Sequence, residues 1–125
     1  MPMFGAPFLA ACTAAALCTG SPDAATPASS LVLSLTDAGG NTTSVELMCD
    51  PAQGTHPQAD TACRALERAD GDFTRLPAKD QACTMIHSPV LAEARGNWYD
   101  TPVDFSTEYP NACFADAQSG GVFSF

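Results

Sequence analysis

Two stretches near residues 30 to 50 have the pattern of neighbouring β-strands. Residues 31–35 are mostly apolar, residues 37–41 are polar and rich in glycine, and residues 43–49 are rich in β-branched and apolar side chains. Glycine and asparagine between two such runs favour a tight reversal of the chain. The pattern predicts a β-hairpin. An irregular loop is expected over residues 50–59, where two prolines and one glycine occur.

The next stretch has the periodicity of a short amphipathic helix over residues 62–69. Charged side chains lie between the apolar positions, and Gly71 favours the end of the helix. Asp60 or Thr61 is the expected N-cap, because short polar side chains accept a hydrogen bond from the first turn. The apolar positions at helical spacing are Cys63, Leu66 and Ala69.

Two further β-rich stretches, residues 90–94 and 98–105, lie on either side of Gly96 and Asn97. This pair suits a two-residue hairpin turn, in which positive φ angles are required. Pro102 is expected to break the second strand, because proline has no backbone N–H to donate.

The last part of the chain predicts a short helix over residues 110–117, a turn at Gly120 and Gly121, and a final strand over residues 122–125. Together with the earlier stretches, this gives five strands and one or two short helices. The expected fold class is therefore α+β.

The N-terminal stretch reads as an export leader. Residues 1–18 are apolar and small, although they carry no basic residue, and they are too short and alanine-rich for a membrane-spanning helix. Within them, residues 9–12 match the lipobox of bacterial lipoproteins, so lipidation of Cys12 is the alternative to plain cleavage and release. The polar residues that follow predict a flexible tether. The expected organisation is a leader and tether over residues 1–30 and a folded domain over residues 31–125.

Four of the six cysteines lie in the folded part and indicate disulfide bonds. No Cys-x-x-Cys pair occurs, and His56 and His87 do not lie at zinc-finger spacing from the cysteines, so no metal site is expected. Stable disulfides in a small domain indicate an oxidising compartment, which predicts a secreted protein. The sequence alone leaves three pairings open. The four cysteines are Cys49, Cys63, Cys83 and Cys113.

The charge balance limits the kinds of partner. The formal net charge is −9, which repels a phosphate backbone or an anionic membrane unless basic residues are concentrated in one place. The basic residues are scattered along the sequence, which predicts no basic patch and leaves a soluble protein as the expected partner. They are Arg64, Arg68, Arg75, Lys79 and Arg95.

Several segments together resemble the Streptomyces subtilisin inhibitor family. The most specific is Cys-Thr-Met-Ile-His-Ser-Pro-Val-Leu over residues 83–91, and the others fall in the family's order and at nearly its spacing. The resemblance implies an antiparallel five-stranded sheet with two helices, a homodimer formed through the sheet, and disulfides that pair Cys49 with Cys63 and Cys83 with Cys113. The supporting segments are residues 31–33, 47–49, 54–57, 62–63, 111–113 and 121–125.

The resemblance also implies a reactive loop for serine proteases. In the family, a substrate-like loop fills the primary pocket of the enzyme, and here the matching residue is Met85, with Met85–Ile86 as the reactive bond. Asn111 is expected to support the loop backbone, and Pro89 limits backbone freedom at its exit. The loop residues expected to contact the protease are Cys83, Thr84, Met85, Ile86, His87 and Ser88.

Methionine at the primary position points to a class of target. Its unbranched apolar side chain suits a broad hydrophobic pocket, whereas the buried aspartate of a trypsin pocket would lack a partner. We expect extracellular subtilisin-like proteases, and also chymotrypsin-like ones, as targets. The alternative is that Met85 is a core residue, although the polar neighbours Thr84, His87 and Ser88 favour an exposed loop.

Two other functions are considered. His87, Ser88 and Asp100 are the residue types of a hydrolase triad, but no nucleophile-elbow pattern surrounds a serine, so neither an enzyme nor a cofactor is expected. The main alternative is a secreted or lipid-anchored binding module that keeps the scaffold without inhibiting. Ser88 favours it, because the family often carries Asp there. Aromatic residues of the 98–109 segment fit either a core or a dimer face; they are Trp98, Tyr99, Phe105 and Tyr109.

Overall fold

A single antiparallel sheet forms one layer of the protein, and the helices form the other. The computed structural model describes residues 26–125, so the export leader and the lipidation site expected at Cys12 lie outside the described residues. In chain order the elements are β1 (Ser29–Thr36), β2 (Thr42–Cys49), β3 (Gln53–Gly54), α2 (Ala59–Arg68), the 3₁₀ turn η1 (Phe73–Arg75), β4 (Val90–Trp98), β5 (Thr101–Tyr109) and α3 (Ala112–Gln118).

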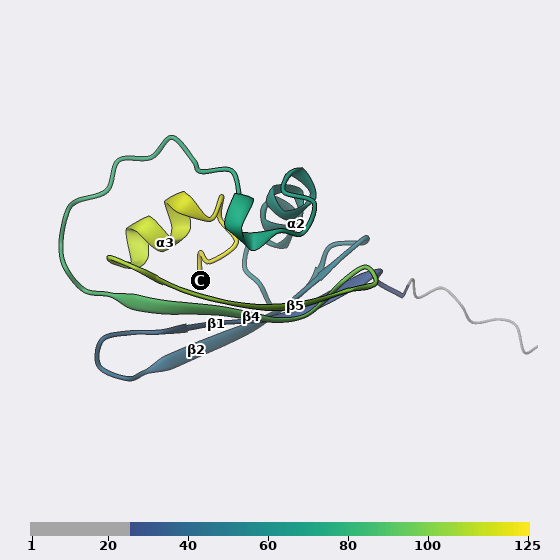
Figure 1. The fold of residues 1–125 in the computed structure, drawn as a ribbon, viewed down its shortest axis with the longest axis horizontal. Helices are drawn as coiled ribbons and strands as arrows, with labels where there is room; N and C mark the ends of the chain where they lie inside the picture. Colours follow the sequence, from purple (N-terminus) through teal and green to yellow (C-terminus); the bar gives the residue numbers. More distant parts are fainter. Residues whose placement is uncertain (1–25) are drawn as a thin grey trace, which may run out of the picture.

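The strands lie in the order β3-β2-β1-β4-β5, and every neighbouring pair is antiparallel. Both helices cover the same face of the sheet, α2 over the β2 and β3 side and α3 over β4 and β5 (Figure 1). The α+β class with five strands, two helices and two disulfides is confirmed. The disulfides join Cys49 to Cys63 and Cys83 to Cys113, as the resemblance implied.

The first hairpin forms where the two β-rich stretches and the glycine-rich segment between them predicted it. In β1 the side chains of Leu31, Leu33 and Leu35 are buried, while that of Val32 points to the uncovered face. Each buried position removes apolar surface from water, and alternation puts all of them on the helix side. β1 begins at Ser29, two residues before the expected start of the domain.

The start of α2 differs from the prediction. The helix begins at Ala59, with Gln58 as an N-cap that makes no side-chain hydrogen bond, so neither Asp60 nor Thr61 caps it. His56 fixes the entry of the chain earlier, because its Nδ1 atom accepts the Gln58 N–H at 2.9 Å while its Nε2 atom is held at the carbonyl oxygen of the distant Val122. The end is as expected, since Gly71 has a φ of 78° and donates its N–H to the Leu66 carbonyl.

The turn of the second hairpin was placed wrongly at Gly96 and Asn97. β4 continues through both residues to Trp98, and the reversal occurs at Tyr99, which has a φ of 54°. Gly96 is required for another reason. A Cβ atom there would lie 2.2 Å from the Ser30 carbonyl oxygen of the neighbouring strand. This glycine therefore allows a close approach of two backbones inside the sheet.

Pro102 does not break its strand. It lies within β5 and pairs with Asn97, and β5 is at the edge of the sheet, where a missing N–H costs no ladder bond on the open side. The predicted final strand over residues 122–125 is also wrong. The segment is a turn followed by irregular chain, and the fifth strand is instead the two-residue β3.

The C-terminal segment contributes to the core instead of the sheet. Phe123 is 1% exposed, and its ring lies within 6.1 to 6.4 Å of the rings of Phe73, Phe105 and Tyr109, measured between centroids. A short apolar run buried on all sides has the same composition as a buried strand, so periodicity cannot distinguish the two.

The aromatic residues of β4 and β5 do not form a dimer face. Trp98 and Tyr109 are buried on the helix side, and Phe105 stacks on Phe73 at 5.2 Å between centroids. Tyr99 is 44% exposed, but it lies at the turn between the strands. Trp98, Phe105 and Tyr109 therefore belong to the core, and these side chains do not support the expected homodimer.

His56 ties α2 to the C-terminal segment. It is 5% exposed, its Nε2 lies 2.8 Å from the Val122 carbonyl oxygen, and its Nδ1 accepts the Gln58 N–H. This pattern needs the neutral ring with its proton on Nε2. Burial lowers the pKa of His56 below its usual 6.5, against the smaller opposing effect of the Val122 hydrogen bond.

We predict that the free energy of unfolding decreases as the pH falls below about 6.5, because His56 binds a proton more weakly in the folded than in the unfolded chain. The stabilisation from neutral His56 is fully present above the pKa that His56 has in the unfolded chain. It is lost as the pH falls towards the lower pKa that His56 has in the folded chain. Urea unfolding between about pH 7.5 and about pH 5 measures it.

The two histidines of the chain provide the control. His87→Gln should keep this pH dependence, since His87 is exposed, whereas His56→Gln should flatten it. Equal slopes in the two variants would show that His56 is not the titrating group.

Candidate functional site

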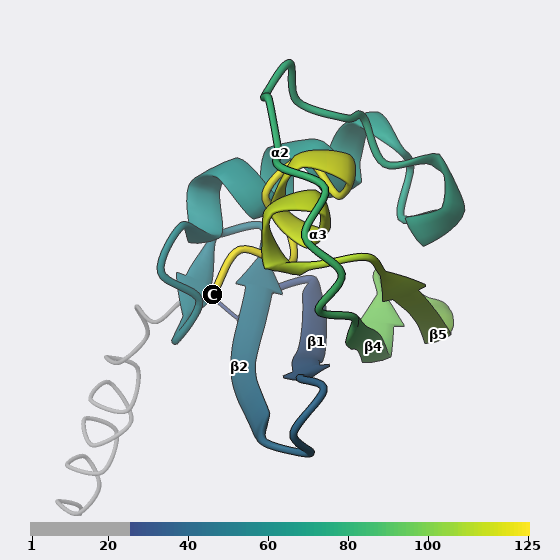
Figure 2. The ribbon, with the colours of Figure 1, turned by 90° about the vertical axis from the view of Figure 1, so that its left-hand side faces the viewer.

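The segment over residues 76–89 contains no helix or strand and arches away from the body between η1 and β4 (Figures 1 and 2). It carries all six residues that the sequence assigns to protease contact. Loops supported by a rigid scaffold commonly carry binding residues. The arch is therefore the candidate site.

The apex of the arch exposes two apolar side chains. Met85 is 82% exposed and Ile86 is 62% exposed, more than any other large hydrophobic side chain in residues 26–125. The flanking residues Thr84, His87 and Ser88 are exposed as well. Met85 is therefore not a core residue. Two adjacent apolar side chains held out in water are typical of a surface that contacts a partner.

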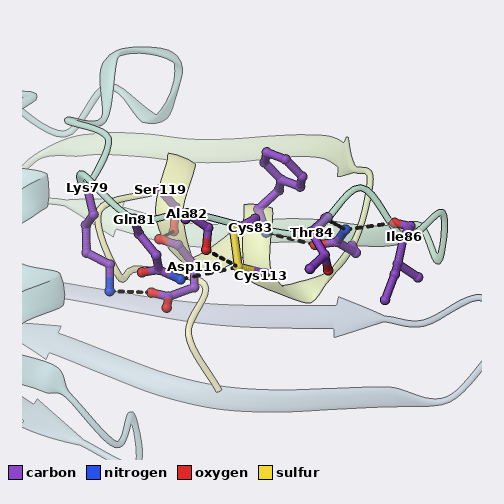
Figure 3. The surroundings of a disulfide bond; sticks show 11 residues. Lys79, Gln81, Ala82, Cys83, Thr84, Ile86, Cys113, Asp116 and Ser119 are labelled. Carbon is purple, nitrogen blue, oxygen red and sulfur yellow. Dashed lines mark hydrogen bonds and ion pairs between the residues drawn. A yellow bond between two sulfur atoms is a disulfide. The ribbon is translucent and has the colours of Figure 1, made fainter.

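A disulfide fixes the chain just before the apex. Cys83, two residues before Met85, bonds to Cys113 in the first turn of α3, with 5.7 Å between the Cα atoms (Figure 3). In the chain-entropy model, a closed loop of this length stabilises the folded state by about 3.5 kcal/mol. The arch is thus covalently attached to the helix layer close to its tip.

The side chain of Asn111 holds the backbone on both sides of Met85. Its Nδ2 donates to the Thr84 carbonyl at 3.1 Å and to the Ile86 carbonyl at 2.7 Å. Its Oδ1 accepts the Phe114 N–H at 3.1 Å, which makes Asn111 the N-cap of α3. An amide has two N–H donors and one carbonyl, so every group of this side chain is used and its orientation is determined.

A backbone hydrogen bond fixes the chain after the apex. The Ser88 N–H donates to the Pro110 carbonyl at 2.9 Å. The ring of Pro89, the residue after Ser88, fixes its own φ. Val90 then enters β4 opposite Tyr109. The chain before the apex is thus tied to α3, and the chain after it is tied to the segment that joins β5 to α3.

The stem before the disulfide has two further anchors on α3. The Lys79 ammonium lies 2.6 Å from the Asp116 carboxylate, and the Lys79 N–H donates to the Ala117 carbonyl at 2.7 Å (Figure 3). Sequence reasoning missed Lys79, Asp116 and the Ser88–Pro110 bond. No local signal marks them, because each contact joins residues that are far apart in the sequence.

These anchors make the apex a pre-ordered ligand. A free peptide loses backbone freedom worth about 1–2 kcal/mol per residue when it is fixed, and a loop already ordered does not lose it again on binding. The arrangement presents Met85 on a backbone held from both sides, with the carbonyl groups of its neighbours already occupied.

A hydrolase triad is excluded by the topology. Ser88 and His87 precede β4, while Asp100 follows its far end. A nine-residue strand rises about 3.3 Å per residue, so Asp100 lies roughly 25 Å or more away.

Within residues 26–125, no group of three or more His, Cys, Asp or Glu side chains could hold a metal ion. In the same residues, no helix has the length and apolar character needed to cross a membrane.

Comparison with known proteins identifies a family whose pattern this chain matches, and similar proteins in Streptomyces. Residues 27–111 match the family described as subtilisin inhibitor-like. "Subtilisin inhibitor-like protein 2" of Streptomyces rochei is 42% identical over 83 residues, which are 65% of this chain and 74% of that protein. "Protease inhibitor SIL-V2" of Streptomyces orinoci is 42% identical over 84 residues, covering 65% of this chain and 77% of the relative.

A solved structure has the same arrangement. Sermetstatin of Streptomyces caespitosus, in complex with subtilisin of Bacillus licheniformis, superposes with a TM-score of 0.59 at 30% identity. The match covers 78% of this chain and 98% of that chain.

We predict that Asn111→Asp loosens the apex without releasing the helix cap. The carboxylate still accepts the Phe114 N–H, but it has no donors for the Thr84 and Ile86 carbonyls and repels them. Backbone order parameters of residues 84–87 should fall from about 0.85 towards about 0.6, and the free energy of unfolding by about 1–3 kcal/mol.

The Phe114 amide is the internal control. It should remain protected from hydrogen exchange in Asn111→Asp and lose protection in Asn111→Ala, which removes the cap as well. Unchanged order parameters at residues 84–87 would show that the other anchors suffice.

Proposed function

The chain belongs to the subtilisin inhibitor-like family, a family of protease inhibitors and not of enzymes, and on that premise we propose that it inhibits subtilisin-like serine proteases as a tightly held substrate analogue. Met85 enters the primary pocket of the enzyme, and Met85–Ile86 is the bond presented to the catalytic serine. The observation that carries the proposal is the exposed Met85 between two carbonyl groups that Asn111 holds.

The side chain of Met85 favours enzymes with a broad apolar primary pocket. Methionine has no charge to offer the acidic base of a trypsin-type pocket, while its flexible thioether fills an irregular apolar one. Subtilisin-like enzymes are the main targets on this argument, with chymotrypsin-like enzymes as further ones.

The anchors explain why such a loop would inhibit and not be consumed. After attack, the two halves of a cleaved bond separate in a flexible substrate. Here Cys83 on one side and Ser88 on the other stay attached to α3 and to the segment before it. The new amine would remain close to the acyl group, so resynthesis of the bond competes with hydrolysis.

A binding module without inhibitory activity is the second candidate. Ser88, at a position where the family often has Asp, is the residue that favours it. A titration of subtilisin activity separates the two functions. Stoichiometric loss of activity supports the inhibitor, while steady cleavage of the protein, or no effect, supports the module.

The location of the protein outside the cytoplasm and its oligomeric state are also proposals. Two disulfides in a domain of this size fit a secreted protein, with lipid anchoring through Cys12 as the alternative. The uncovered sheet face exposes Val32 at 51% and Leu91 at 37%, four positions apart along the paired strands β1 and β4, as two apolar contact points for a homodimer. Sedimentation at micromolar concentration tests this, and a monomer alone would reject it.

We predict that Met85→Lys moves the preference from subtilisin towards trypsin-like enzymes, because an ammonium group can pair with the acidic base of their pocket. Affinity for trypsin should rise about tenfold or more. Inhibition constants for both enzymes measure the change. Met85→Leu is the matched control and should keep subtilisin inhibition. An identical inhibition profile in the lysine variant would show that Met85 does not enter the primary pocket of the enzyme.

We predict that Cys83→Ser together with Cys113→Ser converts the protein from inhibitor to substrate, because the chain just before Met85 is then no longer bonded to α3. Cleavage at Met85–Ile86 is followed by mass spectrometry during incubation with subtilisin. The other disulfide, Cys49–Cys63, remains and keeps α2 on the sheet. If the double variant still inhibits tightly and resists cleavage, the anchoring argument is wrong.

A further inference from the structure

Three basic residues gather around one cavity on the helix side, although the sequence suggested scattered charges. Arg64, Arg68 and Lys79 all line it, together with Thr61 and Gly120, and its volume is about 270 Å³. This volume is several times the roughly 30 Å³ that a water molecule occupies in the liquid. The expectation that no basic patch exists is therefore wrong for this place.

The fold brings these residues together from two segments. Arg64 and Arg68 are one helical turn apart on the same side of α2, and both are exposed. The stem of the arch then runs past this helix, and the Lys79 N–H bond to Ala117 holds it there. Gly120 allows the close approach, since a Cβ atom on it would lie 2.6 Å from the Pro77 carbonyl oxygen.

The positive charge of the cavity is only partly balanced. Lys79 pairs with Asp116, but within residues 26–125 neither arginine forms an ion pair. Asp60 and Glu67 lie on the same helix and make no ion pair with them in this structure. Like charges four residues apart destabilise a helix, so two unpaired arginines there have a cost. In a chain of net charge −9, three of the five Lys and Arg residues surround this one cavity.

We propose that this cavity binds a phosphate or sulfate group, either as the free ion or as an ester on a larger molecule. Two guanidinium groups provide flat forks of N–H donors, which match the oxygens of such a group, and the Thr61 hydroxyl and the Lys79 ammonium add donors at the rim. The cavity opens to solvent between α2 and the stem, so an ester tail can leave it.

The proposed oxyanion site is separate from the protease contact. None of the residues that line the cavity is among residues 83–88, which are assigned to protease contact. Lys79 also anchors the stem, so the variants of the test change only Arg64 and Arg68, which make no contact with the arch through an ion pair. Binding there and inhibition of subtilisin can therefore succeed or fail independently.

The test measures binding of inorganic phosphate by calorimetry and its effect on thermal unfolding, with sodium chloride at matched ionic strength as the reference. The reference is needed because any salt screens the self-repulsion of an acidic protein. We expect phosphate to raise the midpoint of unfolding beyond chloride. In Arg64→Gln with Arg68→Gln, affinity should fall about tenfold or more.

Arg75→Gln with Arg95→Gln is the matched control, since it removes the same charge from places outside the cavity. It should keep phosphate affinity within about twofold, and both double variants should still inhibit subtilisin. Equal losses of phosphate affinity in the two double variants, or no phosphate effect beyond chloride in the wild type, would overturn the proposal.

A parallel titration with glucose 6-phosphate distinguishes a site for the free ion from a site for a phosphate ester on a larger molecule. Tighter binding of the ester than of inorganic phosphate, lost in Arg64→Gln with Arg68→Gln, assigns the site to a phosphorylated molecule. Equal or weaker binding of the ester assigns it to the free ion.

Discussion

The N-terminal end of α3 is the point on which the geometry of the arch depends. Asn111 caps the helix with its carbonyl oxygen and holds the carbonyl groups on either side of Met85 with its amide nitrogen. In the first turn of the helix, Cys113 holds the stem by a disulfide. The same few residues thus begin a helix and hold the loop. A change that moves this end of α3 moves the apex with it.

The rest of the fold places this helix end. α3 lies over β4 and β5, and the chain passes directly from β5 through Pro110 to Asn111, so the sheet fixes where the cap sits. Phe123, buried among other aromatic rings, fills the space between the helices and the sheet. The core therefore provides a rigid support, and the functional side chains at the surface gain their order from it.

Local patterns predicted the elements whose cause is local, and missed those whose cause is a distant neighbour. The apolar run over residues 31–35 and the helical spacing of apolar residues in α2 reflect burial against the core, so both elements were visible in the sequence. Gly96 was mistaken for a turn because the reason for it is the carbonyl of Ser30 on another strand. The Lys79–Asp116 pair and the arginine-lined cavity likewise exist only after α2, α3 and the stem have assembled. Exposure of Met85 was predicted from its polar neighbours together with the family resemblance.

On the proposed mechanism, the anchored arch keeps both ends of a cleaved Met85–Ile86 bond in place. The most direct test is the hydrolysis equilibrium of this bond, approached from intact protein and from purified cleaved protein with a small amount of subtilisin. Both samples should reach the same mixture, with a substantial fraction of intact protein and with resynthesis in the cleaved sample. Complete cleavage of the intact protein, with no resynthesis in the cleaved sample, would show that the anchors do not hold the two ends together.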